Sequence, residues 1–158
     1  MNFLPLLKAL EDIENSYRET SPLFIFDMQE WVKLPDSAIS HVARKVPHSS
    51  IFSSVNLIKA AEADHICNTT LCLAGFAVRH IPYRFIIQDD IELSVLAYVC
   101  LDNQQAKAEL EQIMYSNTER QKQYDTNFPH GVGWRSSIPF DVVREDVEEF
   151  LAKWSVSK

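Results

Sequence analysis

Residues 64–80 read Asp-His-Ile-Cys-Asn-Thr-Thr-Leu-Cys-Leu-Ala-Gly-Phe-Ala-Val-Arg-His. From Leu71 to Val78 the residues are apolar or small and carry no charge, which is typical of a buried helix. Thr69 or Thr70 is suited to cap the start of such a helix, and Pro82 is suited to stop it. The pattern predicts a central buried helix over residues 69–80.

Two residues of this stretch carry a more detailed prediction about the backbone. Glycine inside a helix costs about 1 kcal/mol relative to alanine, so Gly75 needs an offsetting benefit. Its neighbours are also small, which predicts that another backbone approaches the helix closely. Asn68 is among the few residue types that tolerate a left-handed backbone, so we expect a sharp turn there.

The composition limits the class of protein. At 158 residues the chain is the size of one domain, which we expect to span residues 1–158. The net charge is −7, and acidic and basic residues are interspersed. Without a cationic stripe, direct nucleic-acid binding is disfavoured. The acidity suits a basic partner or a decoy for a nucleic-acid-binding protein, but it is also ordinary for a soluble protein.

The same composition bears on the compartment. No apolar run reaches membrane-spanning length, and the first residues contain neither a basic leader nor a small-residue cleavage site. Three cysteines are an odd number, which favours reduced thiols over a disulfide framework. We therefore expect a cytoplasmic protein that does not interact with membranes.

Helical spacing recurs on both sides of the central stretch. Further helices are predicted at residues 3–17, 51–63, 90–100, 102–114 and 139–154. The apolar run 23–26 is a candidate buried extended segment, and 83–88 is the best strand candidate or else a buried connection. The expected fold is mainly α, a compact bundle of about six helices around residues 69–80, with one short extended segment as an option.

Capping patterns refine three of these elements. Asp27 has the layout of an N-cap, with Glu30 three residues later, so a short helix is predicted after it. A buried Asp beside aromatic residues can also be a functional carboxylate, and Asp27 is kept as a candidate site residue. Asp89 or Asp90 is expected to cap the helix that ends at Cys100.

Residues 102–105 form another capping box, so the chain there reads as a helical hairpin or a helix-turn-helix. Lys107 is the only basic residue between Asp102 and Asn117. That helix is therefore poorly suited to reading DNA.

A metal site is the first chemical hypothesis for the central stretch. His65, Cys67, Cys72 and His80 lie within it. Eight helical residues rise by about 12 Å, so Cys72 and His80 cannot share one ion. Cys67 and Cys72 also lack the short spacing of a zinc knuckle. We predict no metal, and we predict no cofactor because no phosphate-cradling loop is present.

A reactive cysteine is the second chemical hypothesis. Cys67 precedes a predicted helix start, where the helix dipole favours a thiolate, and His65 is a candidate base. A redox pair of Cys67 and Cys72 is a further option, although it lacks the two-residue spacing of the oxidoreductase motif. The competing interpretation is that these cysteines are buried small apolar side chains.

The longest irregular stretch is predicted at residues 115–139. It contains His130, Trp134 and Arg135, and Trp and Arg are favoured at binding hot spots. Long loops are often functional. The alternative is a loop laid over the core, with Trp134 as its anchor.

Two motifs also support a resemblance. They are Phe26-Asp27-Met28-x-x-Trp31 and Cys67-x-Thr69-x-x-Cys72-x-Ala74-Gly75-x-Ala77, followed by a helix pair around Leu101 and Gln105-Ala106. The chain thereby resembles small uncharacterised bacterial and phage proteins with a Phe-Asp-Met segment and a Cys-Gly-Thr-x-x-Cys-x-Ala-Gly-Trp-Ala-like stretch. The resemblance spans roughly residues 24–115. It implies a shared fold and brings no known activity.

The chain departs from that pattern at three positions. Asn68 replaces a glycine, Phe76 replaces a tryptophan, and Cys100 stands where a Leu-Gly-Leu turn has its glycine. Asn68 preserves the left-handed turn and Phe76 preserves an aromatic core residue. The third departure weakens the prediction of the hairpin turn.

These observations favour an interaction or regulatory module that is encoded by a phage or mobile element and binds another macromolecule, with a protein as the expected partner. The contact is expected around Trp134 and Arg135. The alternative is a cysteine-dependent enzyme or a small-ligand-binding protein that uses His65, Cys67, Cys72 and Asp27. The sequence leaves the oligomeric state open.

Overall fold

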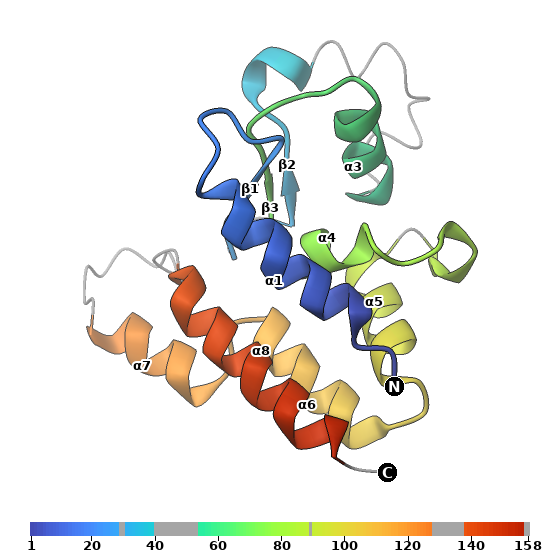
Figure 1. Ribbon diagram of the computed structural model, residues 1–158, viewed down its shortest axis with the longest axis vertical. Helices are drawn as coiled ribbons and strands as arrows, with labels where there is room; N and C mark the ends of the chain where they lie inside the picture. The colour runs from blue at the N-terminus through green and yellow to red at the C-terminus, as the bar shows by residue number, and fades with distance from the viewer. Residues whose placement is uncertain (29–30, 40–53, 89, 128–137, 157–158) are drawn as a thin grey trace.

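The computed structural model describes residues 1–28, 31–39, 54–88, 90–127 and 138–156 (Figure 1). In chain order the named elements are α1 (Leu4–Ser16), β1 (Phe24–Phe26), β2 (Val32–Lys33), α3 (Ser54–Ala63), β3 (Thr69–Leu71), α4 (Leu73–Val78), the 3-10 helix η1 (Tyr83–Phe85), α5 (Ile91–Cys100), α6 (Gln104–Met114), α7 (Glu119–Asn127) and α8 (Phe140–Ser155). The predicted mainly α class is confirmed.

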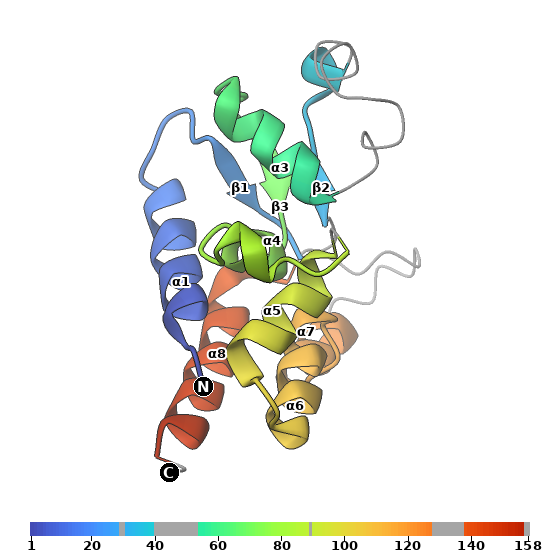
Figure 2. The same cartoon turned by 90° about the vertical axis from the view of Figure 1, so that its right-hand side faces the viewer.

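The elements are arranged from one end of the molecule to the other. The small sheet and α3 lie at the upper end in Figures 1 and 2, and α6, α7 and α8 lie at the lower end. Between them, α4 packs against α1 and α5. Every residue of α4 is buried, as predicted for the middle of this stretch.

The predicted start of the central helix is wrong. Residues 69–71 form β3, the middle strand of the sheet, and neither Thr69 nor Thr70 caps a helix. β3 runs parallel to β1, with Phe24 opposite Thr69, and antiparallel to β2, with Val32 opposite Leu71. Two partner strands thus satisfy its backbone, so strand pairing with distant residues overrides the local helical pattern.

The two details predicted for this stretch are confirmed. Asn68 has a φ of 64°, in the left-handed region. A Cβ on Gly75 would lie 3.0 Å from Leu71 Cβ and 3.2 Å from the Trp31 carbonyl oxygen. Gly75 therefore lets α4 approach the sheet more closely than an alanine would without a shift of its neighbours.

Around the sheet, one prediction is confirmed and one is wrong. The extended segment at 23–26 is present as β1. The helix predicted to start at Asp27 is absent, because the chain continues into β2 and the Asp27 backbone N–H donates to the Leu71 carbonyl oxygen at 3.0 Å. Pairing with β3 again overrides a local helix signal.

Residues 83–88 do not form the predicted strand. Tyr83–Phe85 is a 3-10 helix, and Ile87 makes an isolated bridge with Asp90. The segment is not a buried connection either, since Tyr83 is 64% and Phe85 43% exposed. Its aromatic residues Tyr83 and Phe85 are exposed, whereas Ile86 is partly buried against the core.

The helical hairpin formed by α5 and α6 is confirmed. The Asp90 carboxylate accepts from the Leu93 N–H at 2.9 Å, so Asp90 caps α5 as predicted. Asn103 caps α6, one residue after the predicted Asp102, by accepting from the Ala106 N–H at 3.0 Å. Between the two helices, Leu101 has a φ of 53° and a ψ of −123°.

Aromatic side chains join the sheet to α4 and α8. The Phe76 ring lies 6.2 Å from Phe24 and 6.3 Å from Phe26, measured between centroids. Phe26 in turn meets Phe140, the first residue of α8, at 5.6 Å. This core fixes the orientation of α8 relative to the upper half of the molecule.

The stretch 115–139, predicted to be irregular, contains a helix. α7 spans Glu119–Asn127, and its sequence is almost entirely polar. Gln121 is nevertheless fully buried, donating from its amide nitrogen to Asp146 at 2.9 Å. The sequence did not reveal α7 because polar contacts to α8, rather than an apolar stripe, hold it in place.

Candidate functional site

The structure places the two cysteines of the predicted site in different environments. Cys72 is 2% exposed at the junction of β3 and α4. Burial raises the pKa of its thiol to about 11, so the thiol stays protonated at neutral pH. Cys67 is half-buried, and its thiol lies 3.9 Å from the backbone carbonyl oxygen of His65. The contact is to the backbone of His65 and not to its imidazole.

Metal-ligand residues are not gathered at the central stretch. Within the described ranges, no group of three or more His, Cys, Asp or Glu side chains is placed to hold a metal ion. His80 instead pairs with α1, its Nε2 lying 2.6 Å from Asp12 Oδ2. Arg79 reaches the same carboxylate oxygen at 3.2 Å. His80 and Arg79 thus tie α4 to α1.

The other predicted site residues lie elsewhere. Asp27 follows β1 and faces Tyr17, whose pKa is raised first by burial and then by the charges of Asp141 and Asp27. His130, Trp134 and Arg135 lie outside the described residues. The Asp27 N–H donates to the carbonyl oxygen of Leu71, the residue before Cys72, so these two predicted site residues directly follow two paired strands.

One cluster was not anticipated from the sequence. The Tyr115 hydroxyl donates to the Glu92 carboxylate, and the Trp31 ring lies 5.5 Å from the Tyr115 ring. Burial raises the pKa of Glu92, although the hydrogen bond from Tyr115 opposes that shift. The three residues come from the position before β2, from α5 and from the end of α6, so no local sequence signal links them.

An apolar groove lies beside α5 and is here called the Phe85 groove. Its volume is about 490 Å³, within the range of ligand-binding clefts. The described residues that line it are Asn2, Pro82, Arg84, Phe85, Ile86, Ile87, Ala97, Tyr98 and Leu101. Among these, Arg84 is the only charged side chain.

The walls of the Phe85 groove are anchored by backbone contacts. On one side, the Asn2 N–H donates to the Val99 carbonyl oxygen at 3.0 Å, and the Asn2 side chain donates to the Tyr98 carbonyl oxygen at 3.1 Å. On the other side, the Ile87 N–H donates to the buried Ser94 hydroxyl at 2.8 Å. The segment after α4, which extends to the right in Figure 1, is thereby held against α5.

The chemistry of the Phe85 groove is aromatic and aliphatic. The rings of Phe85 and Tyr98 lie 5.3 Å apart, and the Arg84 guanidinium lies 4.9 Å from the centre of the Phe85 ring. Leu101 is 47% exposed at its edge. These residues have no catalytic constellation among them, but aromatic and arginine side chains are the types that anchor protein interfaces.

Comparisons of the chain with known proteins found no match. No protein-family model, no curated protein and no solved structure matches the chain.

No helix in the described part of the chain is long and apolar enough to cross a membrane.

Proposed function

We propose that the protein is an interaction or regulatory module that binds a protein partner through the Phe85 groove. The observation that carries the proposal is the set of exposed apolar side chains on two neighbouring parts of the chain, the segment after α4 and the end of α5. Tyr83, Phe85 and Leu101 are 43% to 64% exposed, and Phe85 and Leu101 rim the groove. Adjoining exposed apolar residues on a protein surface mark interaction sites.

The charge of the Phe85 groove limits the kind of partner segment that fits it. Since Arg84 is the charged residue among the described lining, a complementary segment carries an apolar anchor beside a carboxylate. The protonated, buried thiol of Cys72 argues against an enzyme that uses Cys72 as a thiolate. The proposal includes action in the cytoplasm and, from the resemblance described above, an origin in a phage or mobile element.

Leu101→Gly tests the proposal, and it should not incur the loss of stability that a change of leucine to glycine usually causes. Leu101 has a left-handed φ of 53° that glycine adopts freely, so this variant removes an apolar side chain from the groove while relieving backbone strain. The wild-type protein and the variant are captured gently from the cells that encode the protein, and native mass spectrometry identifies what each retains. We expect a stoichiometric protein on the wild type and at least a tenfold loss on the variant.

Ile39→Ala is the matched control, because Ile39 is a 51% exposed apolar residue that does not line the groove. It should retain the partner as the wild type does. A bare wild-type chain, a bound small molecule in place of a protein, or equal capture by wild type and Leu101→Gly would each contradict the proposal.

A further inference from the structure

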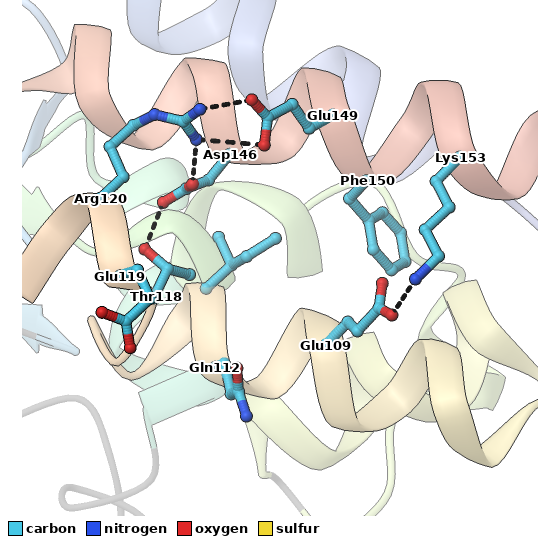
Figure 3. Close-up of a pocket in the computed structure, with 10 residues that line it drawn as sticks. Glu109, Gln112, Thr118, Glu119, Arg120, Asp146, Glu149, Phe150 and Lys153 are labelled. Carbon is cyan, nitrogen blue, oxygen red and sulfur yellow. Dashed lines mark hydrogen bonds and ion pairs between the residues drawn. The ribbon is translucent and has the colours of Figure 1, made fainter.

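A second groove lies between α6, α7 and α8 and is here called the acidic groove (Figure 3). Its volume is about 390 Å³. Four carboxylates and two cations line it: Glu109, Glu119, Asp146 and Glu149, with Arg120 and Lys153. It is separate from the Phe85 groove and shares no lining residue with it.

Arg120 organises one end of the acidic groove. Its guanidinium pairs with Asp146 and Glu149, as Figure 3 shows, and its Nε lies 3.1 Å from Glu145 Oε2. A single positive charge thus faces three carboxylates. The hydrogen bond from Arg120 lowers the pKa of Glu149, so this carboxylate stays ionised well into the acidic range. Three carboxylates around one guanidinium give this end of the groove an excess of negative charge.

The other end of the acidic groove is also ionised. Burial opposes ionisation of Glu109, but hydrogen bonds from Lys153 and Trp154 hold its pKa below the ordinary value. Figure 3 shows this pair set apart from the Arg120 group, with Phe150 between them. Ile113 and Phe150, both nearly fully buried, supply an apolar floor.

Charge and shape together select one kind of occupant. With the paired Glu145 included, five carboxylates face two cations around the groove. A segment with Lys or Arg side chains compensates this excess, and the aliphatic stems of those side chains suit the apolar floor. A nucleic acid or another polyanion is repelled by the same charges.

We propose that the acidic groove binds a basic segment of a protein partner, with Lys or Arg side chains directed at Glu145 and Glu149 and their stems over Phe150. This site goes beyond the Phe85 groove and does not depend on it. Association driven by such charges weakens as salt is added, because the carboxylates on the rim are exposed.

The probe is a fluorescein-labelled amphipathic peptide of Lys, Arg and Leu, and the reference is the same peptide with Gln at every basic position. Fluorescence anisotropy with the full chain measures affinity, and backbone amide shifts in NMR spectra locate the contact. We expect the basic peptide alone to bind, with shifts on α6, α7 and α8. Shifts elsewhere on the molecule would overturn the proposal.

Three variants separate the groove from the overall negative charge. Glu145→Gln with Glu149→Gln should weaken binding about fivefold, since exposed ion pairs are individually weak. Lys153→Gln removes a cation from the groove and should strengthen binding about twofold. The matched control, Glu11→Gln with Glu14→Gln, removes the same charge from α1 and should change affinity less than twofold.

Circular dichroism and thermal melts verify that all three variants fold. Equal weakening by the groove pair and the α1 pair would show attraction to net charge alone and refute the site. If the basic peptide does not bind the wild-type protein at low salt, the acidic groove is refuted as well. This result would not bear on the partner of the Phe85 groove.

Discussion

Gly75→Ala tests the close approach of α4 to the sheet. Gly75 is the third residue of α4, and an added methyl group would meet Leu71 Cβ at 3.0 Å and the Trp31 carbonyl oxygen at 3.2 Å. Neither neighbour moves easily. Leu71 lies in β3 and is paired with β1 and β2 simultaneously, and the Trp31 oxygen belongs to the backbone next to β2.

The expected magnitude follows from two opposing terms. Extra volume in a packed core costs about 1–3 kcal/mol. Alanine recovers at most about 1 kcal/mol of helix propensity, and less than that in the first turn. The free energy of unfolding should therefore fall by about 1–2 kcal/mol, which lowers Tm by roughly 2–8 °C for a chain of this size.

Urea unfolding, followed by circular dichroism, measures this change, with equal m-values as evidence that the unfolded state is unaltered. Ala77→Gly in the same helix is the matched control and should cost about 2 kcal/mol through lost propensity and a lost buried methyl group. If helix propensity alone governed α4, the two substitutions would have opposite signs. A gain in stability for Gly75→Ala would refute the packing argument.

Three further predictions concern carboxylates and thiols at different depths in the protein. Asp146→Ala removes the acceptor of a buried network, so the free energy of unfolding in urea should fall by about 3 kcal/mol. The Glu145 side chain is 62% exposed, so Glu145→Ala should lower it by less than about 1 kcal/mol. Burial raises the pKa of Glu92, so its ionisation lowers stability as pH rises through that pKa, and the penalty is absent below the unfolded value of about 4.3. The free energy of unfolding of Glu92→Gln should therefore rise relative to that of the wild type between pH 4 and pH 7. Urea unfolding at several pH values measures it, and a difference between the two proteins that does not change with pH would contradict this. A thiol reagent should modify Cys67 in the native protein, but Cys72 and Cys100 only after unfolding, because both are buried.

Neither groove was anticipated from the sequence. Residues 83–85 were predicted to belong to a strand or a buried connection and not to a site, because periodicity does not distinguish a partly exposed segment from a buried one. The acidic groove was not found because Arg120 and Glu149 are 29 residues apart and meet only when α7 lies against α8. No spacing rule connects them.

For the fold, the sequence by itself determined the elements that rely on local interactions. Amphipathic spacing specifies α1 and α8, and side-chain caps mark the starts of α5 and α6. The tolerance of Asn68 for a left-handed φ specifies the turn before β3. Only the tertiary structure decided that residues 69–71 form a strand, because β3 depends on hydrogen bonds to segments far away in the chain. It likewise decided the position of α7, whose buried Gln121 is held by Asp146 of α8.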